Sequence, residues 1–179
     1  VQEEIADRIA ARLVAQVDHE SLRRAKRRAP ASLDAYELVL RGRELHGRAT
    51  EAGTIAARAM FDRAIAADPN YATAHAWQAF TIQRGFTHHW GEPRGRAALA
   101  PALAHAQRAA ELEPDSPLCL SRLAFVLTLH GRTEEAIEIA RAAVRLNPCA
   151  YDSRADYAMI LGNGGQPAEA VRQFRIVLA

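Results

Sequence analysis

The amino-acid sequence predicts an all-α protein, a solenoid of about four helical hairpins preceded by an amphipathic N-terminal helix. A pattern that spans residues 117–148 returns from residue 151 onward at an offset of 34 residues, which aligns Gly131 with Gly165. In addition, alanine is abundant and aromatic residues make up only 6% of the chain, a composition that favours helices over sheets. A fixed period of this length is typical of stacked helix pairs rather than of a single enclosed core.

Residues 1–30 do not fit the repeat, and we expect them to form a helical linker from an upstream domain that this sequence lacks. Apolar residues recur there at steps of four, as in an amphipathic helix, at Ile5, Ile9, Leu13 and Val17. A basic run over 23–28 follows, and Pro30 ends the helix. Because no aromatic residues are interleaved with this run, we interpret it as a solvated helix face or a salt-bridge partner rather than as a nucleic-acid site.

Residues 31–179 are predicted to form the repeat domain, with hairpins at about 33–68, 71–113, 117–147 and 151–178. A proline follows the last helical run of each of the first three hairpins and marks its end, because proline cannot continue a helix. These prolines are Pro69, Pro114 and Pro148. The third hairpin has the clearest pattern, with Leu120, Leu123 and Leu127 at helical spacing before Gly131 ends the first helix. The fourth hairpin repeats that order around Gly165.

The second hairpin is predicted to carry a turn enlarged by about eleven residues, 84–94. Insertions of this kind in repeat proteins form loops on one edge, and that edge is often functional. The turn contains His88 and His89, but adjacent histidines diverge on a helix or strand and lack the spacing of a metal-binding pair. A ligand-sensing module built around this turn stays open as an alternative function.

The repeat resembles the tetratricopeptide repeat. In the third hairpin the matching residues are Leu120, Leu123, Ala124, Leu127, Gly131, Ala136, Ala140, Ala143 and Pro148. In the fourth they are Tyr157, Ala158, Leu161, Gly165, Ala170 and Phe174. The large aromatic residue early in the family's first helix is missing from all four hairpins. The resemblance implies a right-handed α-solenoid that acts as a protein–protein interaction scaffold, without catalytic residues of its own.

A second resemblance concerns the whole arrangement. The strings at 1–10 and 33–42, followed by a repeat with an enlarged turn, look like the C-terminal half of certain bacterial signalling proteins. Those proteins carry an upstream adenylate/guanylate cyclase domain or a winged-helix DNA-binding domain. The resemblance implies a regulatory region of such a cyclase, with a transcriptional regulator as the alternative, in either case in the cytoplasm.

The composition argues against several other classes of function. No stretch approaches the roughly 20 consecutive apolar residues that span a bilayer, so we expect no membrane insertion. The net charge of +2 is too small to indicate nucleic-acid binding. Lys26 is the only lysine, which rules out a phosphate-binding P-loop, and no nucleophile and base stand in a known motif. We therefore predict no catalytic site, no cofactor and no metal, and we interpret Cys119 and Cys149 as reduced small residues.

Candidate partner-binding residues follow from superposing the repeats. In a tetratricopeptide stack the first helices line the concave groove, and the superposition places one residue of each hairpin at the same groove position: Arg43, Phe80, Phe125 and Met159, with Trp77 beside them. Such an apolar-leaning stripe suits a helix or an extended peptide. The alternative is that Phe80 and Phe125 pack between repeats. The basic residues with which related repeats capture chaperone tails are not expected at these places.

The last helix is predicted to present an apolar face. Phe174 and Val177 lie on it, and only part of that face is expected to pack within the fourth hairpin. Exposed apolar patches tend to find a partner. We therefore expect a homo-oligomer formed through the C-terminal repeat.

Overall fold

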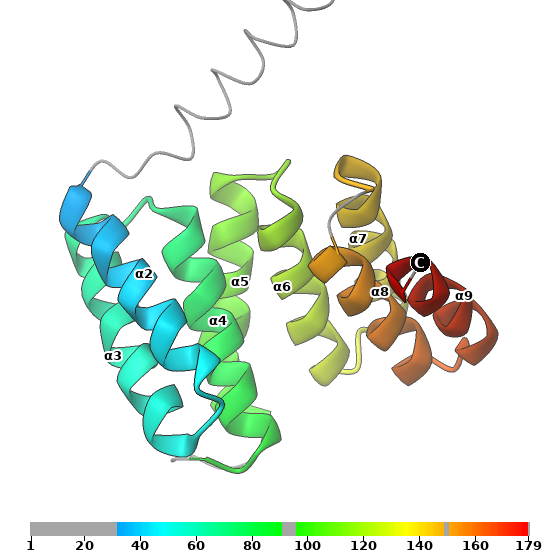
Figure 1. The fold of residues 1–179 in the computed structure, drawn as a ribbon, viewed down its shortest axis with the longest axis horizontal. Helices are drawn as coiled ribbons and strands as arrows, with labels where there is room; N and C mark the ends of the chain where they lie inside the picture. Colours follow the sequence, from blue (N-terminus) through cyan, green and yellow to red (C-terminus); the bar gives the residue numbers. More distant parts are fainter. Residues whose placement is uncertain (1–31, 91–95, 149–150, 179) are drawn as a thin grey trace, which may run out of the picture.

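The computed structural model describes residues 32–90, 96–148 and 151–178, which fold into four helical hairpins (Figure 1). The hairpins are α2 (Leu33–Gly47) with α3 (Glu51–Ala67), α4 (Ala72–Thr87) with α5 (Ala100–Leu112), α6 (Pro117–Leu129) with α7 (Thr133–Leu146), and α8 (Tyr151–Asn163) with α9 (Pro167–Leu178). A short 3₁₀ helix, η1 (Arg96–Leu99), precedes α5. These ranges contain no strand, so the predicted all-α solenoid is confirmed. The predicted N-terminal helix lies outside the described residues.

The hairpins stack in chain order, from α2 and α3 at the left of Figure 1 to α8 and α9 at the right. Within each hairpin the two helices pack against each other, and α2, α4, α6 and α8 also contact one another in succession. The second helix of each hairpin packs in addition on the first helix of the next. The first helices therefore form one continuous surface, which we name the first-helix face.

Small residues let the helices of a hairpin approach closely. In the first hairpin, Ala57, Phe61 and Ala64 are completely buried. Gly42 of α2 lies against the ring of Phe61, and a Cβ atom at position 42 would come within 2.5 Å of Phe61 Cε1. In the fourth hairpin, Ala170 of α9 is 5% exposed and belongs to the core that the last two hairpins share. These positions match the small-residue places of the repeat pattern.

Local signals in the sequence explain where several helices begin and turn. Ser32 Oγ accepts a hydrogen bond from the backbone N–H of Ala35, and Thr50 Oγ1 accepts one from Gly53, so both residues are N-caps. Gly131 and Gly165 have φ values of +79° and +76°. The left-handed conformation of these turns favours glycine, which is why the two glycines align at the repeat offset.

The boundary of the enlarged turn was predicted wrongly, because its first four residues, Arg84–Thr87, complete α4. The helix passes Gly85 and ends when His89 adopts a left-handed conformation, with φ of +57°. The backbone N–H of Trp90 then donates to the carbonyl oxygen of Gly85 at 2.8 Å. Beyond residues 91–95, which are not described, the chain re-enters the core through η1, where Leu99 is completely buried.

None of the described helices is both long and apolar enough to cross a membrane.

Candidate partner-binding surface

Two aromatic side chains of α4 lie at the centre of the first-helix face. Trp77 and Phe80 are half-buried, and their rings meet edge to face with centroids 5.8 Å apart. The spacing of three residues places both on one side of the helix. Trp77 also stacks on Phe61 of the first hairpin, at 6.1 Å between centroids, which ties this surface to the buried core.

Three arginines from three successive hairpins converge on these rings. Arg43 of α2 has its Cζ 5.2 Å from the centroid of Trp77, and Arg84 of α4 has its Cζ 5.4 Å from that of Phe80. Arg122 of α6 lies over Phe80 at 3.8 Å and within 5.8 Å of Trp77. Each contact of this kind contributes about 0.5–2 kcal/mol, the larger values where water is excluded. We name these five residues the aromatic–arginine cluster.

The side chain of His46 packs against the aromatic rings of the cluster and adds no positive charge to it. Its buried ring lies 4.8 Å from that of Phe80, and its Nδ1 is 3.2 Å from Thr81 Oγ1. Burial, together with the smaller effect of the positive charges of Arg84 and Arg122, lowers the pKa of His46 to about 4. The imidazole is therefore neutral near pH 7, so the positive charge of this surface comes from the arginines.

Arg84 is held in place by the backbone of the preceding hairpin. Its Nη1 donates a hydrogen bond of 2.6 Å to the carbonyl oxygen of His46. Burial, and secondly the nearby Arg122, lower the pKa of the Arg84 guanidinium. The hydrogen bond orients the side chain over Phe80 and links α2 to α4 at the end of the helix that the sequence assigned to a turn.

The sequence-predicted groove residues separate into two groups. Arg43, Trp77 and Phe80 come together in the cluster, whereas Phe125 packs half-buried against the core of the last two hairpins. Met159 lies apart on α8 and is 45% exposed. Phe125 thus contributes to the core that the third and fourth hairpins share, and Phe80 contacts His46 and two arginines.

Sequence reasoning missed Arg84 and Arg122. Arg122 occupies in α6 the place that Trp77 occupies in α4, because the offset that aligns Phe80 with Phe125 also aligns these two. Extending the superposition by that one position would have identified it. Neither arginine stands at the places at which the basic residues of a chaperone-tail clamp were not expected, so that expectation stays a prediction.

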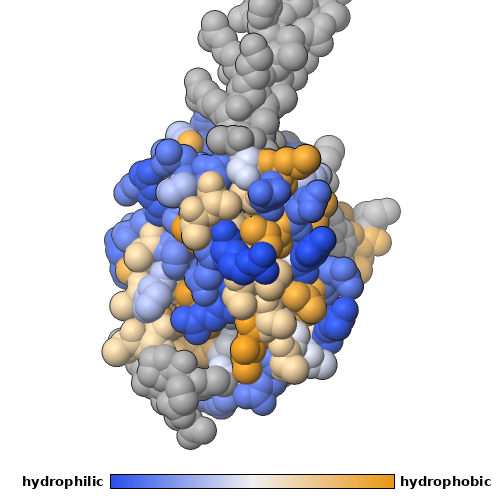
Figure 2. All heavy atoms as spheres, turned by 90° about the vertical axis from the view of Figure 1, so that its left-hand side faces the viewer, coloured by the Kyte–Doolittle hydropathy of each residue, from blue (hydrophilic) through white to orange (hydrophobic). Residues whose placement is uncertain are grey.

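Apolar residues continue the surface onto the first hairpin. Tyr36 and Leu40 of α2 are each 43% exposed, and Leu40 aligns with Trp77 in the repeat. Figure 2 turns this end of the solenoid toward the viewer and shows hydrophobic residues scattered among hydrophilic ones. The first-helix face therefore offers both apolar contacts and guanidinium donors.

The residues predicted for self-association lie on α9. Phe174 is 36% exposed and Val177 is half-buried. Further large apolar side chains of the same helix are exposed, namely Val171, Ile176 and Leu178. The helix thus carries apolar surface, and the part that Val177 contributes is smaller than that of its neighbours.

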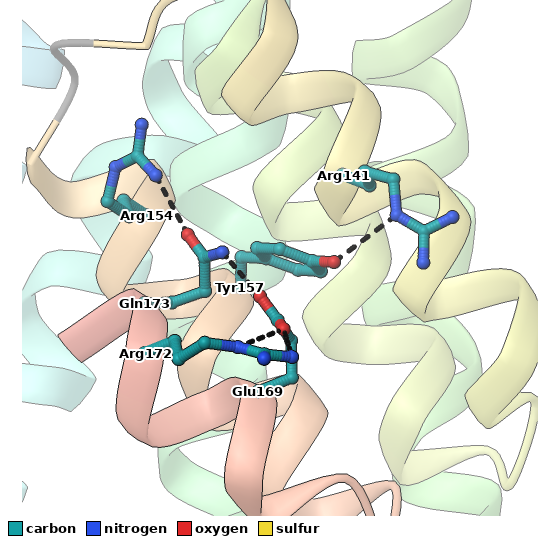
Figure 3. Close-up of polar contacts among 6 residues, drawn as sticks. All are labelled: Arg141, Arg154, Tyr157, Glu169, Arg172 and Gln173. Atoms are coloured by element: carbon teal, nitrogen blue, oxygen red, sulfur yellow. Dashed lines mark hydrogen bonds and ion pairs between the residues drawn. The ribbon is translucent and has the colours of Figure 1, made fainter. Parts of the chain in front are cut away.

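Polar contacts join α7 to α8 and, separately, α8 to α9 (Figure 3). Arg141 Nε of α7 donates to the Tyr157 hydroxyl of α8 at 3.2 Å, and this hydrogen bond is the main cause that raises the pKa of Arg141. Arg154 Nη1 donates to Gln173 Oε1 at 2.8 Å, and Gln173 Nε2 donates to Glu169 Oε1 at 2.7 Å. The first contact links the last two hairpins and the others link the two helices of the last hairpin, which indicates a structural role for both sets.

Other titratable groups of the described ranges do not form a metal site. No group of three or more His, Cys, Asp or Glu side chains has a suitable arrangement within them. His75 Nδ1 lies 3.0 Å from His105 Nδ1, and burial lowers the pKa of both histidines. His88 stacks on Trp90, with ring centroids 4.6 Å apart.

Comparison with solved structures identifies proteins of similar fold. The crystal structure of MamA superposes with a TM-score of 0.55 at 16% identity, over 81% of this chain and 77% of that chain. YrrB, described as a tetratricopeptide-repeat protein with an unusual peptide-binding site, superposes with a TM-score of 0.53 at 20% identity, over 89% and 72%. A mutant O-GlcNAc transferase from Thermobaculum terrenum gives 0.54 at 17% identity over 73% of this chain.

The similarity to the transferase spans only 23% of that protein's length. No protein-family model matches the sequence, and no curated protein matches it either. At these levels of identity the comparisons establish the fold and leave activity and partners undecided. The chain has the helical-hairpin fold of tetratricopeptide-repeat proteins such as YrrB.

Proposed function

We propose that this chain is a protein–protein interaction module that binds a peptide or a helix of its partner along the first-helix face, with the aromatic–arginine cluster at the centre of the contact. The observation that carries the proposal is the convergence of Arg43, Arg84 and Arg122 from three hairpins on one pair of half-buried rings. Aromatic and arginine side chains are the residue types that contribute most to binding energy at protein interfaces.

The geometry of the cluster explains how it would hold a partner. Arg43 is exposed while its guanidinium lies over the Trp77 ring, so its N–H groups can donate to carbonyl or carboxylate oxygens of the partner. Exposed apolar residues nearby, Tyr36 and Leu40, supply area for apolar side chains of the partner. Because the rings and Arg84 are already fixed by contacts within the fold, little side-chain entropy is lost when the partner binds.

We place the module in the cytoplasm, as the regulatory part of a larger bacterial signalling protein such as an adenylate cyclase. The support for this setting is the sequence resemblance of 1–10 and 33–42. Sequencing upstream of residue 1 tests it: a cyclase core there supports the proposal, and a winged-helix domain would assign the module to a transcriptional regulator instead.

A peptide selection tests the binding function directly. We expect a displayed library of random peptides to enrich binders on the purified chain, and ¹⁵N NMR shifts caused by the enriched peptides should lie on α2, α4 and α6. Truncation of one interface arginine typically weakens binding by about 1–2 kcal/mol, so Arg43→Ala should raise the Kd roughly tenfold.

Arg58→Ala is the matched control, since Arg58 is also exposed but lies on α3, a second helix. Its Kd should stay at the wild-type value. Peptides that map to the second helices, or equal affinities of the two arginine variants and the wild type, would contradict the proposed binding surface.

A further inference from the structure

A polar pocket lies next to the aromatic–arginine cluster, between the first halves of α6 and α8. Its volume is about 360 Å³. It is bordered also by the start of α4 and by the residues that end α5 and α7. Its charged lining residues and two of its serines are Glu113, Ser121, Arg122, Asp152, Ser153 and Asp156. First helices supply most of its lining, and Arg122 belongs to both the pocket and the cluster.

Several residues that line this pocket have buried polar atoms without hydrogen-bond partners among the described residues. Arg122 is 6% exposed, and its Nε and Nη1 make no hydrogen bond. The same holds for Ser121 Oγ and for Asp156 Oδ2. Arg122 Nη1 and Asp156 Oδ2 form an ion pair by distance, 3.4 Å, but not a hydrogen bond. Since buried polar groups in native proteins are nearly always paired, these atoms indicate a polar occupant.

The charge of the lining indicates the sign of that occupant. Three carboxylates, those of Glu113, Asp152 and Asp156, border the pocket together with one guanidinium, that of Arg122. Burial raises the pKa of Asp156 and Asp152 raises it further, while Arg122 lowers it. A positively charged group placed between these carboxylates would stabilise their ionised forms, whereas an anion would be repelled by them.

We propose that the pocket receives a lysine or arginine side chain of the peptide that binds along the first-helix face. Asp152 and Asp156 pair with the cationic group, and Arg122 and Ser121 donate to a carbonyl oxygen of the same peptide. This assignment rests on the proposed function, because a bound peptide brings both a cation and an adjacent carbonyl acceptor. The assignment specifies the partner as a peptide segment in which a basic residue is next to the residue that contacts Trp77 and Phe80.

A small probe isolates the pocket from the rest of the binding surface. N-acetyl-arginine amide carries the cation and the carbonyl groups, and N-acetyl-citrulline amide has nearly the same shape without the charge. In ¹⁵N NMR titrations of the full 179-residue chain, the arginine probe should give saturable shifts at the amides of Ser121, Ser153 and Asp156 at millimolar concentrations. The citrulline probe should bind at least about tenfold more weakly, because it cannot pair with the carboxylates.

Asp152→Asn tests the carboxylate that can be changed without disturbing the fold. Asp152 is exposed, whereas replacing Asp156 would leave the buried Arg122 without its counter-ion. The variant should weaken the arginine probe several-fold and leave the citrulline probe unchanged. Asp34→Asn is the matched control, since Asp34 is likewise exposed in the first turn of a first helix, and it should bind both probes like the wild type.

Equal binding of the two probes, shifts that lie elsewhere, or shifts that do not saturate would overturn the assignment. The peptide selection separates this failure from failure of the proposed function. Peptides that contact the cluster but tolerate replacement of every lysine and arginine would refute the basic-residue pocket and leave the binding surface intact. Binding of the arginine probe without any peptide at the cluster would refute the binding surface and, with it, the peptide as occupant.

Discussion

His46 shows how one buried residue shapes the chemistry of the surface above it. The ring is a packing platform for Trp77 and Phe80, and it stays neutral because burial and two arginines disfavour its protonation. A charged imidazole at this place would add to the repulsion among the guanidiniums of the cluster. Because the imidazole of His46 is neutral at pH 7, it adds no repulsion to the positive charges of Arg84 and Arg122.

The lowered pKa of His46 predicts that the free energy of unfolding decreases at acidic pH. The pKa of His46 is about 4 in the folded chain and 6.5 in the unfolded chain, so between these values the unfolded state binds more protons. The free energy of unfolding should be fully retained above pH 6.5, decrease as the pH falls and level off below pH 4, with a total loss on the order of 3 kcal/mol from this residue. Urea unfolding followed by circular dichroism at several pH values measures it.

His46→Gln is the comparison variant. It removes the titration and should be less stable at pH 7 but lose less stability on acidification. His75 and His105, whose pKa values burial also lowers, contribute the same direction of change in both proteins. Parallel pH profiles of the wild type and His46→Gln would show that His46 does not titrate with a lowered pKa.

At the scale of single elements, the sequence predicted the hairpins best where turn chemistry is local. Gly131 and Gly165 mark their turns because the conformation itself favours glycine. The end of α4 escaped prediction because His89, not Gly85, takes the left-handed conformation. A glycine inside a helix is only mildly unfavourable, and the contacts that carry α4 past it, such as Arg84 to His46, lie 38 residues apart in the chain.

The candidate site was predicted in part for a related reason. The repeat period placed Arg43, Trp77 and Phe80 on one face, and that much follows from helical geometry. The same superposition aligns Arg122 with Trp77, but arginine is normally a surface residue, and the burial of Arg122 depends on how α4, α6 and α8 pack together. The burial of Arg122 is determined by packing between hairpins, and it cannot be predicted from the sequence of α6 alone.

Close helix crossings predict a specific effect of side-chain size in α9. Ala170→Leu should overpack the crossing with α8, where Tyr157, Ile160 and Leu161 are buried, and destabilise the protein by about 1–3 kcal/mol. Ala168→Leu is the control on the same helix, since Ala168 is exposed and a leucine there meets solvent. Thermal unfolding measures both variants; equal melting temperatures would show that position 170 has room for a larger side chain.

At the scale of the whole molecule, each hairpin contacts mainly its neighbours, so stability is approximately a sum of hairpin and interface terms. The interface of the last hairpin combines the apolar core that it shares with the third hairpin and the hydrogen bond from Arg141 of α7 to Tyr157 of α8. The outward side of α9 keeps exposed apolar residues, which is the feature on which the predicted self-association depends.

We expect the chain to self-associate through α9. Light scattering at increasing protein concentration should show a mass above that of one 19.6 kDa chain, and Phe174→Glu or Val177→Glu should shift the distribution toward the monomer. Ile55→Glu is the control, because Ile55 is a similarly exposed apolar residue on α3, at 55%. A monomeric wild type at high concentration, or an equal shift for the control, would rule out this role of α9.

The position of Arg122 has a consequence for the energetics of any partner that occupies both sites. Its Cζ lies 3.8 Å from the centroid of the Phe80 ring, and its Nη1 lies 3.4 Å from Asp156 Oδ2. A group that moves Arg122 at one site changes the binding affinity of the other site. By thermodynamic linkage, occupation of the second site changes the affinity of the first by the same factor. The two contacts should therefore be cooperative, and a double-mutant cycle between a residue of each site should give a coupling energy different from zero.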